Sequence, residues 1–144
     1  MTLLRRLDHV AIVVRSTERA LRFYEGRLGL PVASSEEISS PRARLTYLDM
    51  GNAYLQLVEP LDGDSQLSEW LDQHGEGLHH ICFGVDDIAA AAELSDPGSS
   101  VTLGTGRGRP SCFVTAADSF GVRIECTGFN RAEDVDAVAG WLPA

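Results

Sequence analysis

The chain has 144 residues, of which 44% are hydrophobic and 7% aromatic, enough for one compact domain or for two small halves that share a core. Its 21 acidic residues against 12 basic ones give a net charge of −9, which disfavours nucleic acid and anionic membranes as partners. No apolar run is long enough to span a bilayer, and the first 15 residues do not resemble a signal peptide. We therefore expect a cytoplasmic protein.

Cysteine and lysine content narrows the chemistry further. Cys82, Cys112 and Cys126 are odd in number and show no close pairing, so neither a disulfide framework nor a structural zinc knuckle is expected. All 12 basic residues are arginine, which excludes a Schiff-base mechanism through a lysine amine.

The first half of the chain begins with a predicted strand. The segment Leu7–Val14 is apolar and β-branched, and it is too short for a helix. Ser16 then offers an N-cap for a helix that reaches Leu28, where Gly29 and Pro31 end it. The rest of this half is predicted to hold a polar stretch over 34–40, strands over 43–49 and 53–59 joined by a turn, and a short helix over 67–73.

The second half repeats the first. Leu78–Val85 matches Leu7–Val14 position by position, with an offset of 71 residues between Leu78 and Leu7. A helix is predicted over 87–94, and strands are predicted near 101 and over 111–115 and 121–127. The order β-α-β-β-β therefore occurs twice.

This repeat predicts an α+β fold in which two β-α-β-β-β modules form a curved mixed sheet around a metal-containing cavity. We expect the modules at about 5–62 and 76–129 of a single domain, 1–144. The C-terminal tail, 130–144, is predicted to form a helix that packs on the outside.

Four polar residues occupy equivalent positions of apolar strands in the two modules. His9 and His80 are one pair, and Gln56 and Glu125 are the other. Two imidazoles, a carboxylate and an amide oxygen on rigid strands form a mixed N/O ligand set, suited to Co²⁺, Mn²⁺, Ni²⁺, Zn²⁺ or Fe²⁺. His79 adjoins His80 but points to the opposite strand face, so we expect it to face outward or to support the site.

The motifs of this chain resemble the vicinal oxygen chelate superfamily, which includes glyoxalase I, extradiol dioxygenases and antibiotic resistance proteins. Within it the resemblance is greatest to methylmalonyl-CoA epimerases. The segments that carry the resemblance are LDHVAIVV, FYEGRLGL, YLQLVEPL, GEGLHHICFGVDDI and FGVRIEC.

The resemblance implies a glyoxalase-like fold and a metal-dependent isomerase that enolises a 2-substituted malonyl-CoA or a related acid. It places the metal ligands at His9, Gln56, His80 and Glu125, with Glu125 also the catalytic base. The epimerases use a second glutamate on the strand before the glutamine strand, and Leu45 stands there in this sequence. Substitute bases from adjacent turns would be Glu36, Glu37 or Asp49.

Three arginines are predicted to bind an anionic substrate, for which an acyl-CoA is one candidate. They are Arg107 and Arg109 in a glycine-rich turn, and Arg44 on a strand. The superfamily's habit of pairing modules predicts a homodimer. Two other functions remain open. One is another enzyme of the superfamily, such as a non-haem iron dioxygenase or a glyoxalase-type lyase, and the other is a non-catalytic protein that binds an antibiotic or another small molecule.

Overall fold

The computed structural model describes residues 3–129, and the chain forms two compact units. Unit 1 joins Met1–His9 to His80–Ala144, and unit 2 is Val10–His79. The boundaries fall within strands β1 (Leu4–Val13) and β5 (Gly77–Val85), so each of these strands contributes to both units. The tail predicted over 130–144 lies outside the described residues.

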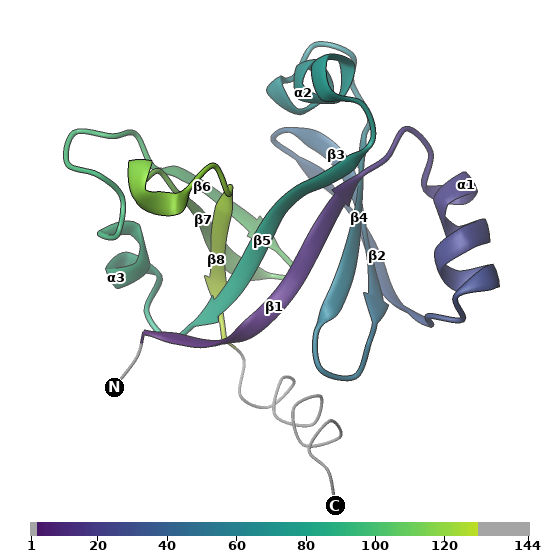
Figure 1. Cartoon of the computed structure of the whole chain (residues 1–144), viewed down its shortest axis with the longest axis horizontal. Helices are drawn as coiled ribbons and strands as arrows, with labels where there is room; N and C mark the ends of the chain where they lie inside the picture. Colours follow the sequence, from purple (N-terminus) through teal and green to yellow (C-terminus); the bar gives the residue numbers. More distant parts are fainter. Residues whose placement is uncertain (1–2, 130–144) are drawn as a thin grey trace, which may run out of the picture. The chain divides into compact units, whose positions relative to one another are not determined.

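Unit 2 contains a sheet in the order β2-β3-β4-β1, in which β2, β3 and β4 pair antiparallel (Figure 1). The hairpin predicted over 43–49 and 53–59 is confirmed as β3 and β4. The elements of this unit besides β1 and β5 are α1 (Thr17–Leu21), the π-helix η1 (Arg22–Arg27), β2 (Val32–Ser39), β3 (Arg42–Asp49), β4 (Tyr54–Pro60) and α2 (Gln66–His74).

The sheet of unit 2 is apolar on both faces. Along β3, Leu45 and Tyr47 pack in one cluster and Leu48 packs in another, as the two-residue period of a strand requires. The first cluster receives α2 through Leu71, and the second is covered by α1 and η1. Between its exposed ends β3 is therefore buried, except at Arg44, which is partly exposed.

The helix predicted from Ser16 to Leu28 is confirmed, with a change of type along its length. Ser16 accepts a hydrogen bond from the Arg19 backbone N–H and caps α1. The chain then widens into η1, and the Leu28 N–H donates to the Phe23 carbonyl oxygen. Gly29 ends the helix with a left-handed φ of 78°.

Unit 1 contains a mixed sheet in the order β1-β5-β8-β7-β6. β5 and β8 pair in parallel, whereas β6, β7 and β8 pair antiparallel. Its core contains Val85, Ala91, Cys112 and Cys126. The elements besides β1 and β5 are α3 (Ile88–Ala92), β6 (Thr102–Gly106), β7 (Arg109–Val114), a 3-10 turn at Ala117–Ser119 and β8 (Ile124–Gly128).

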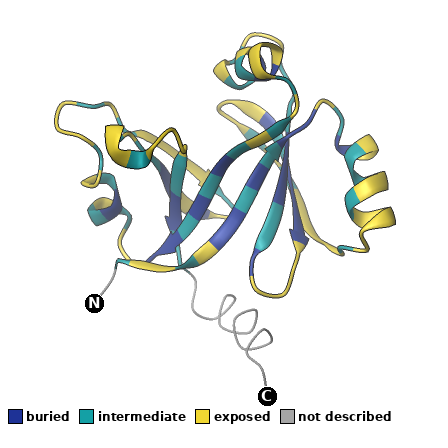
Figure 2. Cartoon of the chain, in the orientation of Figure 1, coloured by how far each residue is buried: buried dark blue, intermediate teal, exposed yellow. Residues whose placement is uncertain are grey.

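Two predicted segments differ from the structure. The stretch over 34–40 was predicted only as polar, but most of it belongs to β2, an edge strand whose residues are largely exposed and so show no apolar alternation (Figure 2). The strand predicted over 121–127 begins later, because Phe120 and Gly121 have left-handed φ values of 57° and 82°. Within 3–129, no helix has the length and apolarity that crossing a membrane requires.

We predict that Leu57→Ala lowers the free energy of unfolding by about 2–5 kcal/mol, because this fully buried side chain would leave a cavity against Val14 and Leu48. The control is Leu103→Ala on β6, where the side chain is 70% exposed and the expected change is below about 0.5 kcal/mol. Urea unfolding followed by circular dichroism measures both. Equal losses in the two variants would contradict the packing described for unit 2.

Candidate metal centre

Three side chains of unit 1 direct their ligand atoms at one another. His9 comes from β1, His80 from β5 and Glu125 from β8, and one ligand atom of each lies within 4.8 Å of the others. Glu125 Oε1 is 3.3 Å from His9 Nε2 and 3.1 Å from His80 Nε2. The two imidazoles and the carboxylate thus converge on one point inside unit 1.

Strand pairing accounts for this convergence. β5 and β8 run parallel, with Cys82 of β5 opposite Glu125 of β8. His80 also lies on β5, two residues before Cys82, so the Glu125 carboxylate comes close to it. Phe113 on β7 is paired with Glu125 and packs its ring edge against His80, with the ring centroids 5.1 Å apart. The site therefore rests on three adjacent strands of one sheet and on no flexible loop.

The spacing of these atoms fits a divalent ion. Two ligands that are each about 2.1 Å from an ion, at angles of 90–110°, lie roughly 3.0–3.4 Å apart. The distances of 3.1 and 3.3 Å from the carboxylate oxygen to the two imidazole nitrogens fall in that range. The donor set of two nitrogens and an oxygen suits first-row divalent ions.

The pKa values in this cluster depend on one another. Burial would raise the pKa of Glu125, but hydrogen bonds and charge from His80 and His9 outweigh it and hold the pKa well below its ordinary value. Burial lowers the pKa of His80. For His9, burial acts in the same direction, yet the hydrogen bonds to Asp8 and Glu125 prevail and raise its pKa. Glu125 is therefore ionised at neutral pH, and His80 is neutral.

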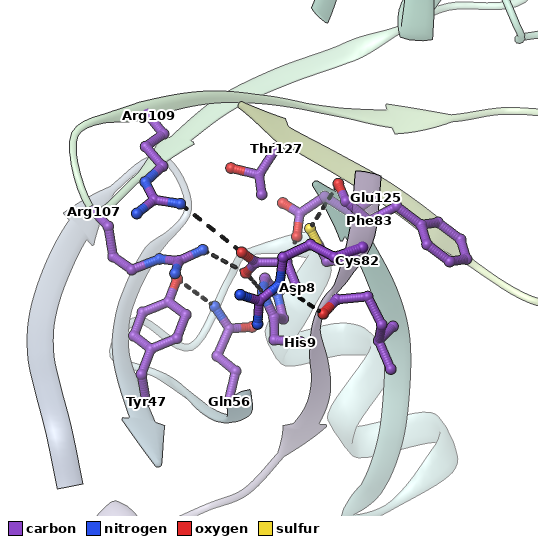
Figure 3. A network of polar contacts seen from close by, with 12 residues as sticks. Asp8, His9, Tyr47, Gln56, Cys82, Phe83, Arg107, Arg109, Glu125 and Thr127 are labelled. Atoms are coloured by element: carbon purple, nitrogen blue, oxygen red, sulfur yellow. Dashed lines mark hydrogen bonds and ion pairs between the residues drawn. The ribbon is translucent and has the colours of Figure 1, made fainter. Parts of the chain in front are cut away.

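A second carboxylate lies on the other side of His9. Asp8 is fully buried, and its Oδ1 is 2.7 Å from His9 Nδ1. The same oxygen accepts a hydrogen bond from Arg107 Nη2, and Arg109 Nη1 is 3.9 Å from Oδ2 (Figure 3). Burial would raise the pKa of Asp8, but His9 and Arg107 lower it overall, so the carboxylate stays ionised.

Asp8, His9 and Cys82 also offer three potential ligand atoms within 4.8 Å of one another. This second group is a poor cation site, because two guanidinium groups already face Asp8 and would repel a metal ion. Burial, together with the charges of Glu125 and Asp8, raises the pKa of the Cys82 thiol well above its ordinary value. The thiol is therefore protonated and a weak ligand.

Gln56 belongs to unit 2, where it lies opposite Tyr47 in the β3–β4 pair. Its Nε2 donates a hydrogen bond of 2.8 Å to the Tyr47 hydroxyl. Its Oε1 is buried and has no hydrogen-bond partner among the described residues. An unsatisfied amide oxygen in a buried position is costly unless a ligand satisfies it, so this atom is a candidate metal ligand.

The three arginines predicted to bind substrate lie in different surroundings. Arg44 Nη2 is 3.2 Å from Glu37 and its Nη1 is 3.4 Å from Glu59, on the face of the unit 2 sheet opposite to Gln56. The proposed site therefore leaves Arg44 out. Arg107 and Arg109 belong to unit 1 and face Asp8, as described above.

Several residues named in the sequence analysis have other contacts in unit 2. Leu45 packs in the apolar cluster against α2. Glu37 pairs with Arg44, and the carboxylate of Asp49 accepts from the Gly51 backbone N–H at 2.7 Å. The ring of His79 packs edge-on against Trp70, with 4.7 Å between centroids.

Sequence reasoning missed Asp8 and Tyr47, which form hydrogen bonds with the predicted metal ligands His9 and Gln56. The signal for Asp8 was present, since a carboxylate inside the apolar segment LDHVAIVV must be paired if it is buried. Tyr47 gave no such signal, because a tyrosine in a strand is ordinary core material. Its contact with Gln56 follows only from the β3–β4 register.

A family model, the glyoxalase/bleomycin resistance protein/dioxygenase superfamily, matches residues 8–116. The chain is 33% identical over 127 residues to the mitochondrial methylmalonyl-CoA epimerase of Homo sapiens, covering 83% of this chain and 72% of the relative. It is 30% identical over 127 residues to the ethylmalonyl-CoA/methylmalonyl-CoA epimerase of Cereibacter sphaeroides, with 83% and 95% covered.

A solved structure shares the fold. It is that of a variant of Streptomyces coelicolor methylmalonyl-CoA epimerase in complex with 2-nitronate-propionyl-CoA, which matches with a TM-score of 0.77 and 34% identity over 87% of this chain and 94% of that chain. The predicted α+β fold of two repeated modules in a mixed sheet is thereby confirmed, and so is the resemblance to the epimerases.

We predict that Co²⁺ binding releases about one proton near neutral pH and strengthens as the pH rises from about 6 to about 8. The pKa of His9 is raised, so the metal-free ring keeps its proton above the ordinary value and loses it only as the pH rises through the higher one. The pKa of His80 is lowered, so this ring contributes a second released proton only at more acidic pH.

Isothermal titration calorimetry in two buffers with different heats of ionisation measures the released protons. The same apparent Co²⁺ affinity at about pH 6 and about pH 8, with no proton released, would contradict this account of the site.

Proposed function

Because the chain belongs to the glyoxalase/bleomycin resistance protein/dioxygenase superfamily, we propose that it is a metal-dependent epimerase that enolises a 2-substituted malonyl-CoA or a related acid. One observation carries the proposal most strongly. Two imidazole nitrogens face a single carboxylate oxygen at 3.1 and 3.3 Å, a spacing that suits a shared divalent ion. His9, His80 and Glu125 are the proposed ligands in unit 1.

Gln56 is the fourth proposed ligand. The support for it is its equivalence to Glu125 in the sequence repeat and the buried Oε1 that lacks a hydrogen-bond partner among the described residues. Tyr47 accepts the hydrogen bond of the amide nitrogen, so Gln56 has a preferred orientation in which the oxygen is available.

The reaction needs stabilisation of an enolate. When bound, a divalent ion supplies Lewis-acid stabilisation of the negative charge that develops on the carbonyl oxygens. Glu125 is the proposed base that removes the α-proton. Its pKa is held far below the ordinary value, so it is ionised but weakly basic, and proton removal by Glu125 depends on strong stabilisation of the enolate.

The charges of unit 1 favour an anionic substrate. Asp8 and Glu125 carry two negative charges, and Arg107 and Arg109 balance them. A divalent ion then leaves the site with excess positive charge. A malonyl thioester brings one carboxylate and gains a second negative charge on enolisation, so it complements this charge both before and after proton removal. An acyl-CoA with a carboxylate next to the thioester is therefore the proposed substrate class.

Inversion also requires a proton donor on the opposite face of the enolate. Asp8 is a second carboxylate of unit 1 beside His9, but Arg107 and His9 keep it ionised, so it has no proton to donate. Leu45 offers no carboxylate either. Glu125 therefore accounts for proton exchange on one face of the enolate.

A second candidate function is non-haem iron dioxygenation. His9, His80 and Glu125 also match the two-histidine, one-carboxylate set of such enzymes. Gln56 as a fourth ligand disfavours this function, because it closes a position that oxygen chemistry needs. Catechol-dependent oxygen consumption by the Fe²⁺ protein would support the dioxygenase instead.

The proposal extends to the state of the protein in the cell. We infer a homodimer in the cytoplasm, because the superfamily resemblance favours a dimer and three free cysteines favour a reducing compartment. Sedimentation equilibrium at micromolar concentration distinguishes a dimer from a monomer.

We predict that the Co²⁺-loaded protein, given one epimer of methylmalonyl-CoA in D₂O, incorporates deuterium at the α-carbon. Proton NMR measures this exchange. Circular dichroism of the same sample follows inversion. Glu125→Gln is expected to slow exchange by about 10²–10⁴-fold, because the amide cannot accept the proton. The matched control, Glu93→Gln, changes an exposed acid near α3 and is expected to exchange as the wild type does.

Exchange with inversion supports an epimerase with a second acid. Exchange with retention supports enolisation on one face by Glu125 alone and contradicts epimerisation. Absence of exchange in a protein that holds its ion contradicts the proposed substrate class and favours dioxygenation or binding without turnover.

We predict that His80→Ala lowers Co²⁺ affinity by about 100-fold or more, and Gln56→Ala by a smaller factor, since a neutral amide oxygen is the weaker ligand. Competition with a chelator, followed by the visible spectrum of Co²⁺, measures both. The control is His74→Ala, because this exposed ring of α2 stacks on Trp70 and belongs to no proposed ligand set. An unchanged affinity in His80→Ala would exclude the site.

A further inference from the structure

Asp8 is a buried charge that the proposed reaction does not use. It has no solvent exposure, and it belongs to the same unit as the proposed ligands His9, His80 and Glu125. A carboxylate in this position is strongly disfavoured unless charged or hydrogen-bonding groups satisfy it. Its partners are therefore the clue to why an acid stands beside a metal ligand in an apolar strand.

The contact between Asp8 and His9 determines which ring nitrogen carries the proton. Asp8 Oδ1 is 2.7 Å from His9 Nδ1, and an ionised carboxylate can only accept a hydrogen bond. Glu125 is also an acceptor, but it approaches the other ring nitrogen at the longer distance of 3.3 Å, so the closer Asp8 favours the neutral ring with its proton on Nδ1. The lone pair then lies on Nε2, the atom 3.3 Å from Glu125 Oε1.

Arg107 holds Asp8 from a turn that is distant in sequence. It stands in the two-residue turn between β6 and β7, closed by the pair Gly106 and Arg109. Its φ of 54° and the φ of 71° at Gly108 are those of a type I′ turn, in which asparagine and glycine are favoured and arginine is not. The side chain donates to Asp8 Oδ1, which compensates for this unfavourable backbone position.

We propose that Asp8 is a positioning residue for His9, and that Arg107 positions Asp8 in turn. The carboxylate orients the ring and selects the tautomer in which Nε2 is free to bind an ion, and the guanidinium group keeps the carboxylate in place. This inference rests on the proposed function only in taking His9 as a metal ligand. It gives Arg107 a role in metal binding in place of the substrate binding predicted from the sequence.

The test uses Asp8→Asn in the full chain, which keeps the size of the side chain and removes its charge. We expect Co²⁺ affinity to fall by about 10–100-fold, as is usual when the hydrogen-bond partner of a metal-binding histidine is changed. In the metal-free protein at about pH 8.5, long-range ¹H–¹⁵N NMR is expected to show the His9 ring mostly protonated on Nδ1 in the wild type and as a mixture of tautomers in the variant.

Asp86→Asn is the matched control. Asp86 is half-exposed and pairs with Arg5 at 2.6 Å in the same unit, so this variant removes an equal charge far less buried than Asp8. It is expected to keep both the wild-type affinity and the wild-type tautomer. An affinity and a tautomer in Asp8→Asn equal to those of the wild type would overturn the proposal.

Arg107→Asn tests whether Arg107 positions Asp8. It also keeps the proposal testable if Asp8→Asn does not fold. Asparagine tolerates the left-handed turn, so the change removes the guanidinium group with little backbone strain. A positioning role predicts a several-fold loss of Co²⁺ affinity without any substrate present, with partial rescue by Arg107→Lys. Unchanged Co²⁺ affinity together with a raised KM would instead assign Arg107 to substrate binding and overturn its positioning role.

These readouts separate the inference from the proposed function. The tautomer is observed in the metal-free protein without substrate, so it tests the contact between Asp8 and His9 even in a chain that proves not to be an epimerase. A wild type that exchanges no deuterium but shows the expected tautomer and Co²⁺ affinities contradicts the function and supports the positioning role. A wild type that binds no Co²⁺ contradicts both.

Discussion

His9 lies between two carboxylates, and the organisation of unit 1 follows from that arrangement. Asp8 approaches one ring nitrogen and Glu125 the other. Two buried negative charges on one imidazole are unfavourable unless cations balance them. On the side of Asp8 the balance comes from Arg107 and Arg109, which are fixed parts of the chain. On the side of Glu125 it comes from His9, whose raised pKa lets the ring carry a proton that a divalent ion can replace.

The two sides of His9 therefore have different chemistry. Arginine cannot give up its charge at any ordinary pH, so the Asp8 side is permanently neutralised and repels a further cation. Glu125 lies against the imidazoles of His9 and His80, which bind a metal ion once they are unprotonated, so a metal ion can enter on this side. This difference explains why one of the two groups of potential ligand atoms, that with Glu125, is suited to an ion and the other, with Cys82, is not.

The sheet of unit 2 contains few buried polar groups. It packs apolar residues on both faces, so polar groups inside it need a reason to be there. The Thr17 backbone N–H and hydroxyl both donate to Glu59, which ties the start of α1 to β4. Gln56 donates to Tyr47, and its Oε1, which has no hydrogen-bond partner within residues 3–129, marks the part of this unit suited to a ligand. A fully apolar strand would have been sufficient for packing.

Local sequence determined the elements with a strong apolar pattern and the residues that the repeat places in register. The strands around His9 and His80 and the capped helix at Ser16 could be predicted, because hydrophobic periodicity and internal repetition are properties of the sequence itself. Strand β2 could not, because an exposed edge strand lacks that periodicity.

Only the tertiary structure decided how these residues are partnered. Asp8 and Arg107 are 99 positions apart in sequence, and Tyr47 meets Gln56 only through the register of β3 and β4. The same holds for Arg44, whose strand was predicted but whose partners were not. Sequence periodicity tells which face of a strand is buried, whereas the partner of a buried polar group depends on which strands and turns the folded chain brings beside it.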